Sequence, residues 1–258
     1  MFWRVLNHSL ASPAPAPSAL ALAASLSAAL KQTDALTPEV QRLADGLVTA
    51  DLSQLDADGP RLAFWVNVYN ALMRHALLAF APTGSVVTNL LLFERACYLV
   101  GGHRLSLNDI EHGVLRRNAR ALPFFCRRFS RRDARQALMV GRLDPRIHFA
   151  LNCGAVSCPP VRRWDAGRLD AQLTQATEGY LRAFTQLDRA RQTVTLSRLL
   201  FLYAADFGTR ADAVRFTARH LEGDDAAWLE AHAGDVTARA GPYDWAFVTP
   251  AAPPPPTR

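Results

Sequence analysis

The chain has 258 residues, of which 50% are hydrophobic and 20% charged, a composition typical of a globular protein and not of a disordered one. Its formal net charge of +6 comes almost wholly from arginine, because Lys31 is the only lysine; this bias is typical of a GC-rich bacterial genome. No run approaches the roughly 20 apolar residues that a membrane-spanning helix needs, so we exclude a membrane span.

The cysteines and the N-terminal segment indicate the compartment. Four cysteines lie far apart in a chain long enough to form a substantial core without disulfides, which favours free thiols in a reducing cytosol. Three prolines within residues 11–17 interrupt the N-terminal segment, whereas a signal peptide has a basic start followed directly by an apolar core. We therefore expect a cytoplasmic protein, with secretion to the periplasm or beyond as the alternative.

The chain divides into three predicted segments. Residues 1–40 form an N-terminal extension in which Ser18–Leu30 is an Ala-rich helix. Residues 41–248 form the main domain, and residues 249–258 are a Pro-rich tail that we expect to be disordered, because it has no core to bury. Thr37 and Pro38 start a second helix, since Thr caps helices well and Pro suits the first helical position.

A long apolar helix is predicted over Leu62–Phe80, after a turn at Asp56–Pro60. A helix that is hydrophobic nearly all round is buried, so its polar stripe of Asn67, Asn70 and Arg74, at i, i+3 and i+7, must have partners. One interpretation is that these side chains bond to neighbouring loops and fix the helix in place. The other is that they line a site, with Asn67 orienting a catalytic histidine.

The next segment combines a hairpin with a helix. Cys97–Val100 and His103–Leu105 flank a Gly-Gly pair, which predicts two antiparallel strands. Ser106-x-x-Asp109 resembles a capping box that opens a helix to about Arg117. His112 lies off the core face of that helix, so it is either a solvent-facing histidine or a base that reaches a site.

An arginine-rich run with interleaved phenylalanines follows. Basic and aromatic residues together can bind nucleic acid. The run has no accompanying nucleic-acid motif, however, and it is more often a solvated face whose phenylalanines lie in the core, so we do not expect nucleic acid as a partner. Its basic residues are Arg116, Arg117, Arg120, Arg127, Arg128, Arg131, Arg132 and Arg135.

The densest chemistry lies between Asp144 and Pro160. Ile147–Leu151 is short and apolar, which predicts a buried strand ending at Gly154, with Cys153 at the sheet edge. Farther on, Leu169–Phe184 is a predicted amphipathic helix and Thr193–Leu196 a short strand. Helices outnumber strands without alternating regularly, so the fold class is α+β: a helix-rich single domain with a small, mostly antiparallel sheet.

The cysteine spacing argues against metal and redox chemistry. His148, Cys153 and Cys158 lack the paired ligand spacing of a structural zinc site. Cys-x-x-x-x-Cys is not the Cys-x-x-Cys of a disulfide oxidoreductase, although a sensor disulfide between the two cysteines fits the spacing. No Gly-rich phosphate loop occurs. We therefore expect no metal and no cofactor.

Nucleophilic catalysis by a thiol remains. It needs a thiolate, a base and a group that orients the base. Cys153 is the predicted nucleophile, with Cys158 as the second candidate. His148 is near in sequence, but residues i and i+5 of a strand point to opposite faces unless the strand bends. His112 comes from another element, so this objection does not apply to it, and Asn67 would orient it. Along the chain the three residues come in the order Asn, His, Cys, whereas papain-like sites have the order Cys, His, Asn.

The reaction and its alternative follow from these residues. Backbone amides of Gly154–Ser157 would form an oxyanion hole, giving a hydrolase or acyltransferase that acts on an amide, peptide or thioester of a small-molecule or peptide substrate. Against this, a cysteine at the end of a buried strand usually acts as a small hydrophobe. The alternative is a non-enzymatic interaction module with a protein partner and a structural cysteine turn.

Several blocks of the sequence resemble a known family. They are Phe64-Trp65-Val66-Asn67-Val68-Tyr69-Asn70-Ala71-Leu72, Ile110-Glu111-His112-x-x-Leu115-Arg116, His148-Phe149-Ala150-Leu151-Asn152-Cys153-Gly154 with Ser157-Cys158-Pro159, and Tyr243-Asp244-Trp245. In this order they resemble domain of unknown function family 547, found in bacteria and plants. The resemblance implies no settled activity. Plant relatives often carry the domain after a coiled coil, which resembles an adaptor arrangement.

Overall fold

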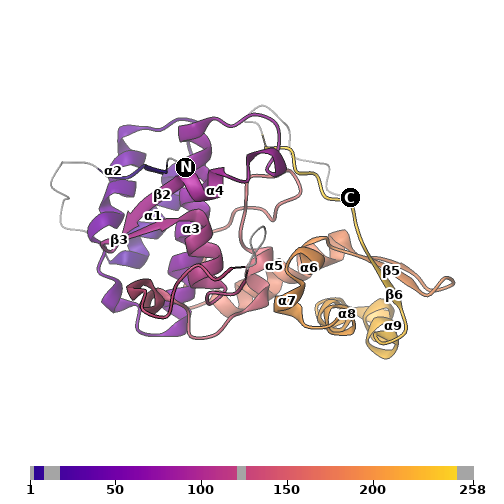
Figure 1. The fold of residues 1–258 in the computed structure, drawn as a ribbon. Helices are drawn as coiled ribbons and strands as arrows, with labels where there is room; N and C mark the ends of the chain where they lie inside the picture. Colours follow the sequence, from indigo (N-terminus) through magenta and orange to yellow (C-terminus); the bar gives the residue numbers. More distant parts are fainter. Residues whose placement is uncertain (1–2, 9–17, 121–125, 249–258) are drawn as a thin grey trace. The chain divides into compact units, whose positions relative to one another are not determined.

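The structure, a computed structural model, describes residues 3–8, 18–120 and 126–248, and these form two compact units (Figure 1). Among them, the first unit takes in the residues up to 144, together with 151–169 and 245–248. The second unit consists of 145–150 and 170–244. The predicted tail, 249–258, lies outside the described residues.

The first unit carries most of the helices and one sheet. Its helical elements are α1 (Ala19–Lys31), α2 (Pro38–Gly46), η1 (Leu47–Thr49), η2 (Leu52–Gln54), α3 (Asp58–Phe80), η3 (Val87–Asn89), α4 (Leu92–Arg95), η4 (Asp109–Leu115) and η5 (Ala134–Leu138). Its strands are β1 (Arg4–Val5), β2 (Ala96–Val100) and β3 (His103–Ser106). The order is β1-β2-β3, with β1 parallel and β3 antiparallel to β2.

α3 is the central helix of the first unit. It begins at Asp58, four residues before the predicted start, because Pro60 lies in its first turn, where a missing N–H costs no intrahelical bond. The predicted turn at Asp56–Pro60 is therefore wrong in its second half. The helix ends where Ala81 adopts a left-handed conformation (φ 42°) just before Pro82. Most of its length from residue 62 to 76 is buried.

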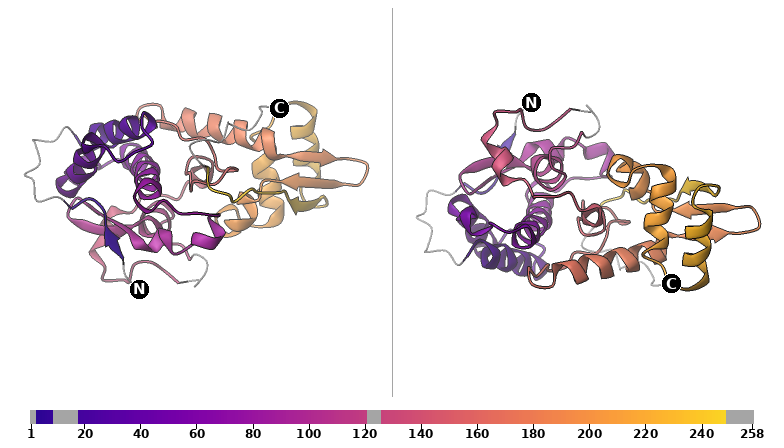
Figure 2. Two further views of the ribbon diagram at one scale, coloured as in Figure 1. Left: turned by 90° about the horizontal axis from the view of Figure 1, so that it is seen from above. Right: turned by 90° about the horizontal axis from the view of Figure 1, so that it is seen from below.

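Two predicted helices and their caps are confirmed in the N-terminal part. The Ser18 side chain caps α1 by accepting from the Ala21 N–H, and the Thr37 side chain caps α2 by accepting from the Val40 N–H. α1 packs against α3 (Figure 2). The Ala-rich helix of the predicted extension is thus part of the core of the first unit, whereas the predicted domain boundaries stay a prediction.

The second unit combines a three-stranded sheet with helices. Its elements are η6 (Pro145–Phe149), α5 (Leu169–Phe184), β4 (Gln186–Asp188), β5 (Thr193–Leu196), α6 (Leu199–Leu202), α7 (Ala204–Phe207), α8 (Arg210–Ala218), α9 (Gly223–His232) and β6 (Thr237–Ala240). The order is β4-β5-β6, with β4 antiparallel and β6 parallel to β5. α8 and α9 lie side by side (Figure 2).

The predicted α+β, helix-rich class is confirmed, with each small sheet mixing one antiparallel and one parallel pair. The strand predicted at Ile147–Leu151 is wrong: Pro145–Phe149 is a 3-10 helix. Pro145 has a fixed φ that suits a first helical turn, and it lacks the N–H that a ladder needs. Burial of Ile147 and Phe149 explains the apolar pattern equally well, and a short apolar run does not by itself separate strand from helix.

Candidate functional site

Two adjacent side chains of α3 hold the two segments that form the candidate site. The Tyr69 hydroxyl donates to Glu111 Oε2 over 2.8 Å, and Asn70 Oδ1 accepts from the Asn152 N–H over 2.9 Å. Consecutive residues of a helix point about 100° apart. We call residues 152–158 the cysteine turn. α3 therefore holds η4 through one side chain and the start of the cysteine turn through the next side chain along the helix.

η4 is a π-helix of seven residues, and it follows the predicted capping box. The Ser106 N–H donates to Asp109 Oδ2, and Ser106 Oγ accepts from the Asp109 N–H. The wider π turn brings the backbone of Gly113 against the Phe129 ring, where a Cβ would lie 2.3 Å from Cζ. Long π-helices are rare and occur often at functional sites.

η4 presents a buried charged cluster that includes His112. Glu111 Oε1 lies 3.7 Å from His112 Nδ1, and Arg116 Nη1 lies 3.0 Å from the same nitrogen. Arginine can only donate, so Nδ1 accepts and the His112 proton lies on Nε2, an assignment that rests on the hydrogen bond to Arg116. In this state His112 is a hydrogen-bond donor at Nε2, and its role as the base stays a prediction.

The cysteine turn is closed by Asn152. Its Oδ1 accepts from the Gly154 N–H over 2.8 Å, and its Nδ2 donates to the Pro159 carbonyl over 2.7 Å. Gly154 has φ 87°, and a Cβ there would lie 2.7 Å from Leu77 Cδ1. Because the backbone conformation and the contact with α3 both require glycine, the turn is held in one shape.

The turn brings the two thiols together. Cys153 Sγ and Cys158 Sγ lie 2.8 Å apart, and the Cys153 N–H donates to Cys158 Sγ over 3.1 Å. The hydrogen bond to Cys158 and burial raise the pKa of Cys153 well above its ordinary value, and the Glu111 carboxylate raises it further. Cys153 therefore holds its proton more tightly than an ordinary cysteine does.

Two backbone amides of the predicted oxyanion hole in Gly154–Ser157 are already used by the fold. The Gly154 N–H donates to Asn152 Oδ1, and the Val156 N–H donates to the Ala246 carbonyl. The oxyanion hole stays a prediction.

Asn67, the predicted orienting residue, bonds to a loop. Its Nδ2 donates to the Trp164 carbonyl over 2.7 Å, and its Oδ1 accepts from the Trp164 N–H over 3.0 Å. Both polar ends of the amide are thus occupied by one peptide backbone 97 residues away. This pairing favours the interpretation in which Asn67 fixes the helix to a neighbouring loop.

We expect Asn67→Leu to lower the free energy of unfolding by about 1–3 kcal/mol, because the buried Trp164 backbone groups lose their partners. Iodoacetamide labelling of Cys153 should keep its wild-type pH profile. Urea unfolding and mass-spectrometric mapping measure the two quantities. Arg74→Gln, on the same face but partly exposed, is the matched control. A shift of the Cys153 profile at unchanged stability would return Asn67 to the site.

His148 belongs to the second unit, whereas His112, Asn67 and both thiols belong to the first. Its Nε2 lies 2.8 Å from Asp206 Oδ2, with both side chains almost fully buried, and its ring stacks on Tyr203 at a centroid distance of 3.7 Å. This buried pair and stack fix the His148 ring within the second unit, and its place in a site stays a prediction.

Two arginines of the arginine-rich run, Arg128 and Arg135, form ion pairs. Arg128 pairs with Glu94 and Asp109, and Arg135 pairs with Asp109 and Asp133. Within residues 3–8, 18–120 and 126–248 no group of three or more His, Cys, Asp or Glu side chains is placed to hold a metal ion, and no helix there is long and apolar enough to cross a bilayer.

Sequence reasoning missed Tyr69, Glu111 and Asn152 as site residues. A signal for Glu111 existed: with Leu107 and Val114 it follows the spacing of the core face, where an acidic side chain requires a partner. The partner, Tyr69, lies 42 residues away, which no local pattern reveals.

The fold and the site define an α+β protein whose paired thiols lie in a turn anchored to a buried helix. The model of the family DUF547, described as a protein of unknown function, matches residues 52–181 of the chain. This match covers half of the chain, including α3, η4 and the cysteine turn, and the chain belongs to that family. The Tyr243–Trp245 block lies outside the matched residues. No curated protein and no solved structure matches.

Proposed function

We propose that the chain is a thiol-dependent hydrolase or acyltransferase acting on an amide, peptide or thioester bond. The observation that carries the proposal is the thiol pair: two sulfurs 2.8 Å apart, one of which also accepts a backbone N–H. Hydrogen bonds to a sulfur favour its charged form. Cys158 receives two of them, one from the Cys153 N–H and one from the Cys153 thiol, so Cys158 supplies the nucleophile.

The sequence nominated Cys153 as the nucleophile, and that assignment stays a prediction that the variants below test. In the proposed reaction the Cys158 sulfur attacks the acyl carbon, and the bond from that carbon to the leaving group breaks. The neutral His112 Nε2–H donates a hydrogen bond to the carbonyl oxygen, and the leaving group takes its proton from solvent. Water or an acceptor then attacks the acyl carbon and releases a proton to solvent, and the Cys158 thiolate leaves, which completes the cycle.

A covalent acyl-enzyme is the expected sign of this chemistry. Incubation with a small acyl thioester should add one acyl group to the protein, and peptide mapping should place it on Cys158. Cys158→Ser should lose at least 90% of the adduct, because a serine hydroxyl is a far weaker nucleophile at neutral pH. Cys126→Ser, at an exposed cysteine, is the matched control and should retain it.

The same experiment decides between the two cysteines. An adduct that maps to Cys153 already in the wild type would restore the assignment made from the sequence. Acylation of Cys126 and Cys158 at equal rates would mean ordinary thiol reactivity, and the proposed function would fail.

One observation favours the second candidate, a non-enzymatic interaction module. The pKa of Cys153 is raised and Glu111 contributes to this rise, whereas catalytic thiols usually lie in electropositive surroundings. In an interaction module the turn acts only as a rigid surface. Folded Cys153→Ser and Cys158→Ser variants would then keep partner binding, and no acyl-enzyme would form with any thioester.

A further inference from the structure

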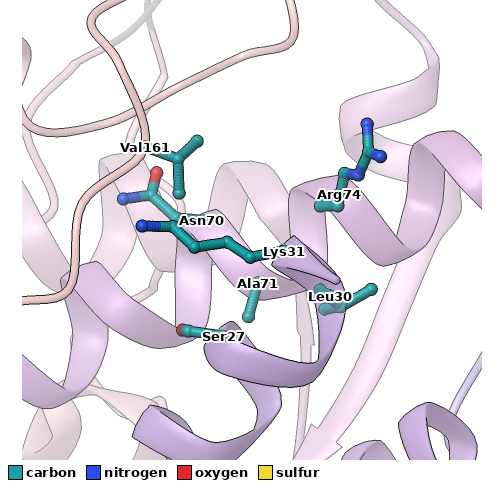
Figure 3. A pocket seen from close by; sticks show the side chains of 7 residues that line it. All are labelled: Ser27, Leu30, Lys31, Asn70, Ala71, Arg74 and Val161. Carbon is teal, nitrogen blue, oxygen red and sulfur yellow. The ribbon is translucent and has the colours of Figure 1, made fainter. Parts of the chain in front are cut away.

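A cavity of about 240 Å³ lies between α1 and α3 in the first unit (Figure 3). It is smaller than the roughly 300–1,000 Å³ of sites that enclose drug-sized ligands, so it suits a small molecule. Its apolar lining comes from Leu30, Ala71 and Val161. Of these, Leu30 and Ala71 are buried and Val161 is exposed, so Val161 marks the rim.

The polar part of the lining is cationic. Lys31 and Arg74 both line the cavity, and none of its described lining residues is acidic. Arg74 also pairs with Asp34, which lies outside the cavity, and donates to the Thr33 carbonyl over 3.4 Å. Because Asp34 neutralises Arg74, the only lysine of the chain supplies the remaining single positive charge.

The close-up view shows how this charge is placed. The Lys31 side chain extends toward Asn70 and Val161, and its ammonium group lies on the same side of the cavity as the Asn70 amide, whereas the Arg74 guanidinium lies at the other end (Figure 3). A ligand with an anionic end and an apolar tail therefore meets a cation and an amide at one side and hydrocarbon along the rest.

The cavity is also joined to the cysteine turn. Asn70 lines the cavity, and its Oδ1 accepts from the Asn152 N–H, one residue before Cys153. The short link from Asn70 through Asn152 means that a molecule in the cavity contacts a residue that positions the turn. Thus Asn70 links the cavity to the cysteine turn.

We infer that this cavity binds a small monoanionic carboxylate with a short apolar tail. A single uncompensated lysine charge matches a monoanion, and a mainly apolar lining matches a hydrocarbon tail. The inference concerns binding and does not depend on the thiol chemistry, so either can fail alone. A carboxylate of this class is also what thioester or amide hydrolysis would release.

The unique lysine allows a direct test. Reductive methylation with ¹³C-formaldehyde keeps the positive charge and gives one side-chain signal, which is identified by its absence from Lys31→Arg. Hexanoate, added at constant ionic strength, should move this signal saturably. Hexanamide, which has the same tail and no charge, should bind about three- to tenfold more weakly, as expected for one partly exposed charge.

Variants separate the tail from the charge. Val161→Trp should weaken hexanoate at least fivefold by filling the rim while leaving the melting temperature unchanged, because Val161 is exposed. In unmodified protein, hexanoate binding followed by saturation transfer should weaken about three- to tenfold in Lys31→Gln and stay unchanged in Lys31→Arg. Equal binding of acid and amide, an unaffected Val161→Trp, or no saturable shift would overturn the inference. Cys158→Ser should bind as the wild type does, whatever the outcome for the acyl-enzyme.

Discussion

Replacing Cys158 by serine is expected to make Cys153 more reactive toward iodoacetamide near neutral pH, although a thiol has been removed. The hydrogen bond to Cys158 is the largest cause of the raised pKa of Cys153, and the charge of Cys158 adds to it. Without the Cys158 sulfur the charge contribution vanishes, and a serine hydroxyl can donate to the Cys153 sulfur, which favours the thiolate, whereas burial remains. The pKa of Cys153 therefore falls toward its ordinary value, and its thiolate fraction rises about tenfold for each unit of the fall.

Labelling rates measured against pH by mass spectrometry test this expectation. In the wild type Cys158 should label first and Cys153 only at a higher pH. The reverse variant, Cys153→Ser, removes one donor from Cys158 and should slow its labelling. Cys97 is an internal control, because burial is the main cause of its raised pKa and neither variant touches it. A Cys153 profile that stays unchanged in Cys158→Ser would show that the two thiols are not coupled.

The hydrogen bonds behind this prediction could not be foreseen from the sequence. The density of chemistry between residues 144 and 160 located the cysteine turn, and the polar stripe on the apolar helix located its anchor at Asn70. Which sulfur accepts hydrogen bonds depends instead on one N–H and one S–H, set by a turn whose shape rests on Asn152 and Gly154. The periodicity of a sequence does not predict which group donates and which accepts within a turn.

The errors in the fold have a similar origin. The helices at Ala19–Lys31 and Pro38–Gly46 were predictable because their N-caps are local. The segment at Pro145–Phe149 was not, since its apolar side chains would be buried in either a strand or a helical turn. The π-helix at Asp109–Leu115 was expected only as a helix, because it depends on Phe129 packing onto Gly113.

The hydrogen-bond partner of Asn67 could not be predicted either, because it lies far away in the sequence. Asn67 was assigned to orient His112 because it lies in the polar stripe of the apolar helix and because the strand-face objection to His148 does not apply to His112. In the structure Asn67 bonds to the Trp164 backbone, and Glu111 and Arg116 lie beside His112. Composition and spacing find buried polar residues, but only the three-dimensional structure assigns their partners.

A buried histidine on α3 is expected to make the protein acid-sensitive. His75 is 1% exposed, and burial lowers its pKa from 6.5 to about 4. Tyr98 Oη donates to the Leu72 carbonyl over 2.9 Å, so its oxygen accepts from His75 Nδ1–H over 3.1 Å. Nε2 has no partner among the described residues. The neutral ring therefore fits the site, and an added proton at Nε2 would be buried without a hydrogen bond.

The sign of the pH dependence follows from the two pKa values. Above pH 6.5 the ring is neutral in both the folded and the unfolded chain, so it makes no difference to stability. As the pH falls from 6.5 to about 4, the unfolded chain takes up a proton that the folded chain does not, and stability is lost. Below about 4 both states are protonated. The full loss is about 3 kcal/mol, at 1.36 kcal/mol for each pKa unit.

His75→Phe should therefore flatten the stability profile between pH 6.5 and 4. At pH 7 the free energy of unfolding of the variant should lie within about 1 kcal/mol of the wild-type value. The variant loses the hydrogen bond to Tyr98, which destabilises it, but it also loses the unpaired buried ring nitrogen, which stabilises it. Urea unfolding at pH 7, 5.5 and 4.5 gives the two curves. Carboxylates also titrate in this range but affect both proteins alike, so the difference between the curves isolates His75. His8→Phe controls for the loss of an exposed histidine. Parallel wild-type and His75→Phe curves would mean that the folded protein accepts the proton at His75, and that this part of α3 opens to solvent more readily than its burial implies.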